Sequence, residues 1–186
     1  VVLGPAGGTD PIVHGGGSGR VEPAYVVSGF EGIQARAQNQ TASSADAVQP
    51  PAAVSYDTGT DDLPHAASLA EAADVAIVFT ATVSSEGTDR VDLGLPAEED
   101  ALVAAVAAVQ ANTIVVVNTP GAALMPWASH PNVSAVLVAF MPGQEAGNAI
   151  ADVLFGLVNP TGRLPLSFPN KDNEVGFTPE MFPGTP

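Results

Sequence analysis

Cysteine is absent from this chain, and basic residues are scarce. The 186 residues contain no cysteine, which excludes disulfides, thiolate catalysis and thiolate zinc sites. Only 5 lysines and arginines stand against 20 acidic residues, and the formal net charge is -15. Such a surface repels phosphate backbones and anionic lipids, so we expect neither nucleic acid nor a membrane as a partner. A neutral ligand such as a sugar meets no such repulsion.

Long hydrophobic runs are also missing. No apolar run approaches the roughly 18 residues that would span a bilayer, and the longest are strand-sized. Hydrophobic residues nevertheless make up 46% of the chain, a share typical of globular proteins and too high for a disordered one. The histidines, His14, His65 and His130, lack metal-ligand spacing, so no metal is expected. We therefore expect a soluble domain with one core.

The two ends resemble cuts through a longer chain. The sequence lacks an initial Met and a signal peptide, begins inside an apolar run, and ends in a stretch rich in proline and glycine. Sequons occur at Asn39 and Asn132, but motifs this short also arise by chance and lend little support to secretion. Together with the acidic surface, they lead us to expect a secreted or extracellular glycoprotein.

Strand-like and helix-like segments alternate along the chain. Strands are predicted over residues 1–3, 52–56, 75–81, 113–117 and 134–139, with a final strand at the alternating Leu164, Leu166 and Phe168. Helices are predicted over residues 22–36, 63–73, 96–111 and 144–155. Residues 41–51 are low in complexity and are predicted to form a surface loop. Buried strands joined by helices predict an α/β three-layer sandwich, with a mostly parallel sheet flanked by helices.

Acidic residues gather where the helix at 96–111 begins. Glu98, Glu99 and Asp100 lie in its first turns, where the helix dipole favours negative charge.

Ligand-binding residues of such sheets gather in the loops after the strands. Three loops qualify, at residues 7–19, 82–94 and 118–126. The first is rich in glycine but has Arg20 where the dinucleotide fingerprint G-x-G-x-x-G needs its last glycine, and it has no P-loop lysine. It also lacks the last glycine of the nucleophile elbow of serine hydrolases. No cofactor is therefore expected, and the loop is either flexible or shaped for close approach of a ligand or another domain.

Residues 84–90 read Ser-Ser-Glu-Gly-Thr-Asp-Arg and follow the most hydrophobic predicted strand. A carboxylate at the carboxyl edge of a sheet can be held by backbone donors and tuned by its neighbours, as acid/base catalysis requires. Glu86 is therefore a candidate catalytic residue. The alternative is a solvated loop in which Glu86 or Asp89 forms an ion pair with Arg90.

Taken together, the motifs of this chain resemble the second domain of family 3 β-glucosidases. The resemblance covers nearly the whole chain and keeps the order of the family's motifs. The matching segments are Gly4-Pro5 with residues 16–19, residues 85–90 with Leu93 and Leu95-Pro96, residues 112–118 with Gly121 and Trp127, and residues 142–149, 151–156 and 159–165.

The resemblance implies an α/β sandwich domain over residues 1–170 and a linker at 171–186 toward a missing fibronectin-like domain. It implies that Glu86 is the general acid/base of a retaining enzyme, whose aspartate nucleophile lies in a barrel domain absent from this chain. No Asp-Trp pair, the usual setting of that nucleophile, occurs here. Ser85 stands where the family often has glycine.

Further roles follow from the same resemblance. Gly17, Ser18 and Ser85 are expected to belong to the substrate cleft or its support, and Asp89 and Arg90 to hold the Glu86 loop. The expected substrate is a β-linked glucoside or oligosaccharide that loses its terminal non-reducing β-D-glucosyl residue.

Because the retaining mechanism needs two carboxyl groups about 5–5.5 Å apart, the chain alone is expected to be inactive. Two alternatives of other classes are a non-catalytic carbohydrate-binding or structural module that kept the fold and, more distantly, a nucleotide-binding domain.

Overall fold

Five parallel strands form the centre of the molecule. The structure is a computed structural model that describes residues 1–39 and 52–181. The strands are paired in the order β2-β1-β3-β4-β5. Their bounds are β1 (Val2–Leu3), β2 (Tyr56–Asp57), β3 (Ala76–Ala81), β4 (Thr113–Asn118) and β5 (Val133–Val138). The predicted sheet is confirmed, and every pairing in it is parallel.

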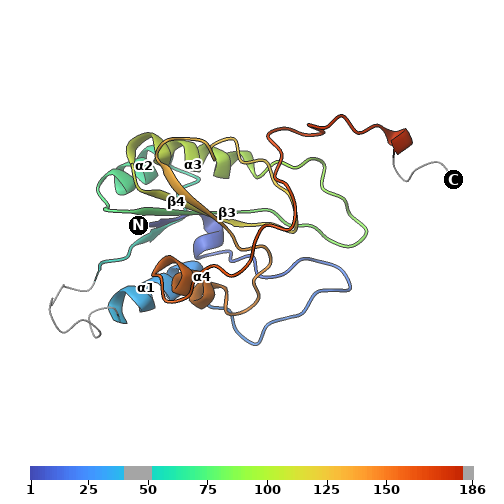
Figure 1. Cartoon of the computed structure of the whole chain (residues 1–186). Helices are drawn as coiled ribbons and strands as arrows, with labels where there is room; N and C mark the ends of the chain where they lie inside the picture. Colours follow the sequence, from blue (N-terminus) through green and yellow to red (C-terminus); the bar gives the residue numbers. More distant parts are fainter. Residues whose placement is uncertain (40–51, 182–186) are drawn as a thin grey trace.

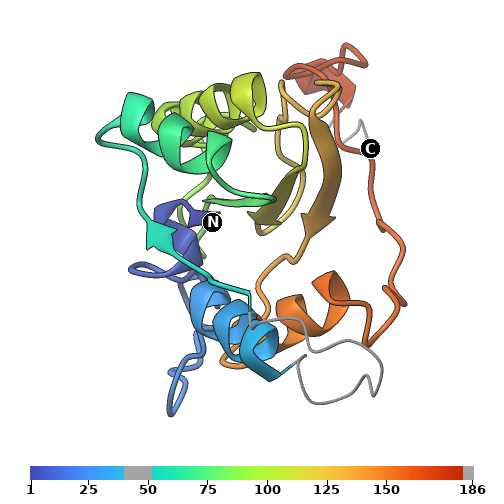
Figure 2. The same ribbon diagram turned by 90° about the vertical axis from the view of Figure 1, so that its left-hand side faces the viewer.

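Helices cover both faces of the sheet, as Figures 1 and 2 show. On one face lie α2 (Leu63–Glu71) and α3 (Ala97–Val109), and on the other lie α1 (Gly29–Asn39) and α4 (Ala146–Leu154). Successive side chains of a strand point to opposite faces. Val115 and Val117 therefore pack into the α2–α3 core, whereas Val116 packs into the α1–α4 core. The three-layer α/β sandwich predicted from the sequence is confirmed.

The first predicted helix begins later than expected. It was predicted over residues 22–36, but α1 starts at Gly29. The reason is a capping box, in which the Ser28 N–H donates to Glu31 Oε2 at 2.8 Å and the Glu31 N–H donates to Ser28 Oγ at 3.3 Å. Just before the box, the Val27 N–H donates to Gln144 O at 2.9 Å, which ties this stretch to the segment before α4. Pro23 was therefore a misleading start signal.

The predicted final strand does not form. Leu164 and Leu166 are 56% and 36% exposed, and only Phe168 packs against the α2–α3 core. Within the described residues, no backbone–backbone hydrogen bond joins residues 164–168 to the sheet. The alternation was correctly observed, but a strand also needs a partner for its backbone groups.

Three other predicted segments differ from the structure or reach beyond the described residues. The strand predicted over 52–56 is shorter and later, since β2 spans only Tyr56–Asp57. The surface loop predicted over 41–51 lies outside the described residues. The predicted linker at 171–186 is described as far as 181, and Asp172 Oδ1 in it accepts from the Leu93 N–H at 3.0 Å.

Two glycines set the distance between α1 and α4. A Cβ on Gly32 would lie 2.1 Å from Gly147 O, and a Cβ on Gly147 would lie 1.9 Å from Ser28 O. Since real Cβ atoms do not come so close to a backbone oxygen, the two helices can only pack this tightly with glycine at both positions. Among the described residues, no helix is both long and apolar enough to cross a membrane.

Candidate active site

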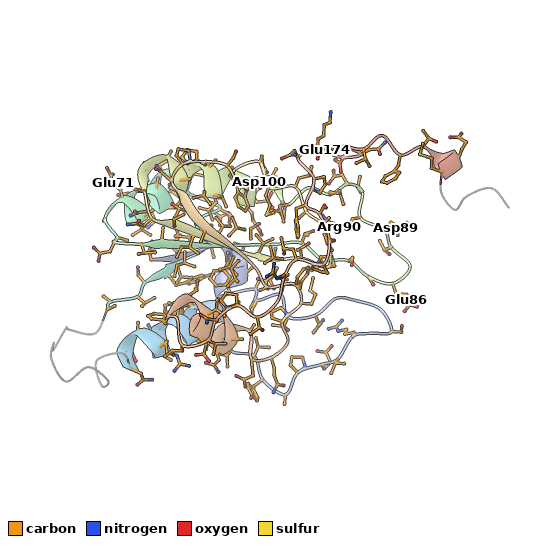
Figure 3. All side chains as sticks on the ribbon, in the orientation of Figure 1. Glu71, Glu86, Asp89, Arg90, Asp100 and Glu174 are labelled. Atoms are coloured by element: carbon orange, nitrogen blue, oxygen red, sulfur yellow. The ribbon has the colours of Figure 1, made fainter. Side chains whose placement is uncertain are left out.

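The candidate residues lie where the strand order reverses. The chain passes from β1 to β2 on one side of the sheet and then crosses to β3 on the other side of β1. In open α/β sheets, ligands bind beyond the carboxyl ends of the strands at such a switch point. The glycine-rich loop leaves the sheet here after β1, and residues 82–94, called the Glu86 loop below, leave it after β3. Figure 3 shows Glu86, Asp89 and Arg90 at this end of the molecule.

The two loops form one structural unit. The Gly16 N–H donates to Ser84 O at 3.0 Å, and Gly16 and Ser85 form a short parallel bridge. The Thr88 N–H donates to Ser85 O at 3.2 Å and closes the turn that carries Glu86. Glu86 is therefore presented on a tight turn that the glycine-rich loop supports.

Close approach explains the glycines of the supporting loop. Gly17 has a φ of 85°, and a Cβ there would lie 2.3 Å from Glu86 Cβ. A Cβ on Gly16 would lie 2.6 Å from Ser85 Oγ. The sequence left open a flexible loop or one shaped for a ligand or another domain. The structure shows that Gly16 and Gly17 make room for the Glu86 loop of the same domain, which neither interpretation named.

Ser18 determines the electrostatics of Glu86 in this chain. The Ser18 N–H donates to Glu86 Oε2 at 2.8 Å, and the carboxylate itself is exposed. Hydrogen bonding from the Ser18 hydroxyl and then from the Ser18 N–H lowers the pKa of Glu86 below the usual glutamate value. Glu86 is thus held as a carboxylate in the chain alone.

The Ser18 hydroxyl can be tested apart from the backbone donor. A Ser18→Ala variant keeps the N–H, so we expect the pKa of Glu86 to rise part of the way toward the usual glutamate value. The measurement is an NMR pH titration of the side-chain carboxyl carbons, with Glu86 assigned through Glu86→Gln. Ser85→Ala is the matched control, because Ser85 Oγ donates to the Glu86 backbone O at 3.3 Å and not to the carboxylate. Equal pKa values in Ser18→Ala and the unmodified chain would contradict the assignment.

Arg90 ties the Glu86 loop to the body of the domain. Its Nη1 donates to Ala122 O at 2.7 Å and its Nη2 donates to Gly94 O at 3.2 Å. The ion pair considered as the alternative is not formed, because the pairs in the described part of the chain join Arg20–Glu22, Arg36–Asp152 and His65–Asp57. For Asp89, which is exposed, no hydrogen bond or ion pair is found among the described residues. The holding role expected of Asp89 therefore has no contact behind it.

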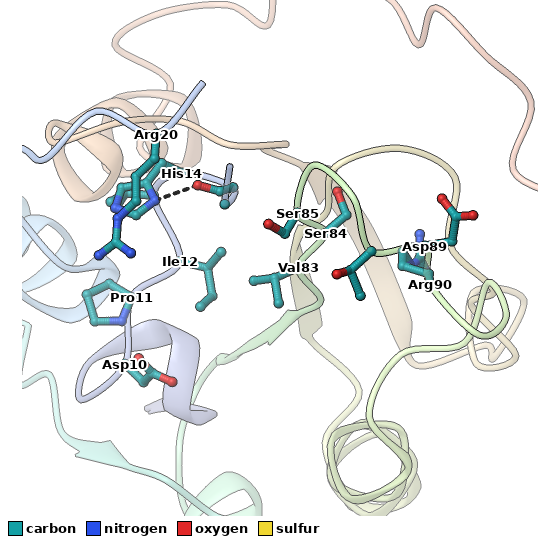
Figure 4. A pocket seen from close by; sticks show the side chains of 14 residues that line it. Asp10, Pro11, Ile12, His14, Arg20, Val83, Ser84, Ser85, Asp89 and Arg90 are labelled. Atoms are coloured by element: carbon teal, nitrogen blue, oxygen red, sulfur yellow. Dashed lines mark hydrogen bonds between the residues drawn. The ribbon is translucent and has the colours of Figure 1, made fainter. Parts of the chain in front are cut away.

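A groove of about 540 Å³ runs between the two loops (Figure 4). Asp10 and His14 line it from the side of the glycine-rich loop, and Ser84 and Asp89 from the side of the Glu86 loop. Glu86 is not among the lining residues; it lies farther out on the turn (Figure 3). Asp10 was missed at the sequence level, since no local pattern marks it and only the pairing of β1 with β3 brings it to the groove.

The His, Asp and Glu side chains of the described residues form no candidate metal site. Within residues 1–39 and 52–181, no group of three or more His, Asp or Glu side chains is arranged to hold a metal ion.

Comparison with known proteins gives one consistent result. The family model described as "Glycosyl hydrolase family 3 C-terminal domain" matches residues 1–183. A β-glucosidase of Schizophyllum commune is 44% identical over 150 residues, which cover 76% of this chain and 73% of that protein. Probable β-glucosidase G of Emericella nidulans is 39% identical over 168 residues, which cover 90% of this chain but 20% of the relative.

Solved structures agree with the sequence relatives. A glycoside hydrolase family 3 β-glucosidase from Neurospora crassa superposes with a TM-score of 0.84 at 34% identity, over 95% of this chain and 23% of that one. A β-D-glucoside glucohydrolase from Trichoderma reesei gives a TM-score of 0.78 at 33% identity, over 93% of this chain and 26% of that one. The chain thus spans only a minor part of these much longer proteins.

Proposed function

The chain belongs to glycosyl hydrolase family 3, and nearly all of it corresponds to the C-terminal domain of that family. We propose that it supplies the general acid/base, Glu86, to a retaining β-glucosidase. The hydrolase class follows from the family, and the relatives compared above are named β-glucosidases. The proposal rests on where the fold places Glu86 and on what holds its side chain there. Its carboxylate is exposed on a tight turn at the switch point of the sheet and is held by a backbone donor from a second loop.

The proposed reaction needs a second carboxyl group from another domain. In retaining hydrolysis, the two carboxyl groups lie about 5–5.5 Å apart on either side of the scissile bond. Glu86 donates a proton to the glycosidic oxygen while an aspartate of the barrel domain attacks the anomeric carbon. Glu86 then takes a proton from the water that releases the sugar. The substrate is a β-linked glucoside that loses its terminal non-reducing β-D-glucosyl residue.

Contact with the barrel domain also adjusts the acidity of Glu86. The first step needs a protonated Glu86, yet the Ser18 hydrogen bonds lower its pKa in the chain alone. Removing water from a carboxyl group raises its pKa, so a domain that covers the Glu86 turn shifts Glu86 toward the acid form. One docking event therefore completes the carboxyl pair and makes Glu86 a competent acid.

Exposed apolar side chains around the same edge support a covering domain. Val83 and Val91 of the Glu86 loop are 52% and 102% exposed, and Val21, just after the glycine-rich loop, is 74% exposed. Apolar groups gathered at one edge are typical of a surface that another protein surface covers.

The test compares the 186-residue chain with its full-length parent on an aryl β-glucoside and on cellobiose. We expect the parent to hydrolyse both and the chain alone to hydrolyse neither. Turnover by the chain at the rate of the parent would refute the need for a second domain. A folded parent that binds these sugars but hydrolyses none of them would instead favour a non-catalytic carbohydrate-binding module.

Secretion and glycosylation stay predictions. The Asn132 side-chain nitrogen, to which a glycan would be attached, donates to Ala107 O at 2.8 Å. A glycan would replace one of the two hydrogens of this nitrogen, so a glycosylated Asn132 would keep a single N–H for Ala107 O. The sequon at Asn39 includes residues outside the described part of the chain.

A further inference from the structure

Glu99 is an acidic side chain in an unusual place. It belongs to the first turn of α3, where the helix dipole favours a negatively charged side chain. The Glu99 side chain is nevertheless buried, and the residue is only 7% exposed. Its neighbour Glu98 is exposed. Acidic residues are rarely buried this fully unless a partner compensates for the lost water. The partner of Glu99 is the Ala81 backbone N–H, which donates to Glu99 Oε2 at 2.7 Å.

This hydrogen bond spans the base of the Glu86 loop. Ala81 is the last residue of β3, directly before the loop, and α3 begins at Ala97, soon after the loop ends. The Glu99 N–H also donates to Pro96 O at 3.0 Å, which fixes the point where the chain re-enters the helix. Glu99 thus joins the segment that leaves the sheet to the segment that returns to it.

The surroundings of Glu99 favour its neutral form. Burial raises the pKa of Glu99, the Ala81 N–H and then the Thr80 hydroxyl oppose that increase, and the nearby Glu98 and Asp100 add to it. Asp10, from the loop after β1, lines the same cavity of about 240 Å³ as Glu99, and no basic side chain lines it. On β3, the Thr80 hydroxyl is buried and lies close enough to the Glu99 carboxyl group to lower its pKa, although no well-aligned hydrogen bond of this hydroxyl is found among the described residues.

We propose that Glu99 is a positioning residue for Glu86. It joins the base of the Glu86 loop to α3 through the Ala81 N–H, and because its side chain is buried, this closed arrangement is most stable while the Glu99 carboxyl group is protonated. The positional claim rests on the contacts of Glu99, and its link to catalysis rests on the proposed function of Glu86. Because the pKa of Glu99 is raised by folding, its contribution to stability falls as the pH rises from the usual glutamate value through the raised one. Glutamine retains the acceptor oxygen and cannot ionise, so it should act as a permanently neutral Glu99.

Hydrogen exchange of the 186-residue chain tests this without any need for catalysis. We expect Glu99→Ala to speed exchange of the Thr82 and Thr88 amides about tenfold, the effect of losing one hydrogen bond to the fold. Glu99→Gln should keep the original protection, and Glu98→Gln is the matched control on the exposed side of the same turn. Amides of the α1–α4 layer should keep their protection in all variants.

The pH series gives a second, independent measurement. After correction for intrinsic exchange, protection of the Glu86 loop should fall with rising pH in the unmodified chain and stay level in Glu99→Gln. Equal pH dependence in these two proteins would overturn the proposal, even if Glu99→Ala failed to fold. Faster exchange in every layer of Glu99→Ala would overturn the positioning role and leave a general structural one. None of these outcomes depends on whether Glu86 proves to be catalytic.

Discussion

Replacing Glu86 by alanine in the full-length parent should lower kcat on cellobiose by about 10²–10⁴-fold, the range that a positioned general acid or base supplies. Without Glu86, the leaving sugar departs as an unprotonated alkoxide, which makes the first step slow. An aryl glucoside with a nitrated leaving group needs no proton, so its first step should be nearly unaffected. Water then attacks without a base, and azide, which needs none, should restore turnover and yield a β-glucosyl azide.

The matched control for Glu86→Ala is Glu71→Ala. Glu71 is also an exposed glutamate, and it lies on α2 at the opposite end of the molecule (Figure 3). We expect it to retain the original kcat, and both variants to retain the original melting temperature because neither side chain is buried. An unchanged rate of Glu86→Ala on cellobiose would refute the acid/base assignment.

Adding one methyl group at Gly147 should destabilise the domain by about 3 kcal/mol, near the upper end for overpacked sites. The new Cβ would lie 1.9 Å from Ser28 O and 2.8 Å from Val27 O, so the clash is with backbone that cannot rotate away. Alanine favours helices over glycine by about 1 kcal/mol, and this gain in α4 is too small to offset the clash. Separation of α1 from α4 would also disturb the capping box at Ser28.

Urea unfolding of the 186-residue chain measures this effect, and Gly162→Ala is the control. Apart from its chain neighbours, no atom of the described residues lies within 4 Å of the Cβ position at Gly162, so we expect a change within about 0.5 kcal/mol, as for other surface substitutions. Equal unfolding midpoints for Gly147→Ala and Gly162→Ala would show that the two helices can separate at no cost. That result would contradict the close packing described above.

Short-range signals were sufficient for most of the fold. The strand predicted over 75–81 and the helix predicted over 96–111 lie within two residues of β3 and α3, because side-chain periodicity and dipole-compatible ends are local properties. The start of α1 was wrong for a local reason too. Ser28 and Glu31 carry the capping-box signal, and the proline at position 23 outweighed it.

Long-range contacts explain what the sequence could not predict. Leu164 and Leu166 alternate as in a strand but find no partner, and only the assembled sheet decides which segments pair. Glu99 lies three, four and seven residues before Leu102, Val103 and Val106, so helical spacing alone places it on the buried face of α3. Its partner, the Ala81 N–H, depends on how α3 lies against the end of β3 and could not be predicted from the sequence.

The sequence by itself determined the α/β class and most of the order of the elements, because these depend on periodicity. It also made Glu86 the candidate acid/base, through the position of its loop after a predicted strand and through the resemblance of the ordered motifs to family 3 β-glucosidases. Only the tertiary structure decided what surrounds Glu86. Ser18 lies 68 positions from Glu86 in sequence, and the pairing of β1 with β3 brings its N–H to the carboxylate. The acidity of Glu86 therefore depends on the strand order, a property of the folded sheet that no short stretch of sequence contains.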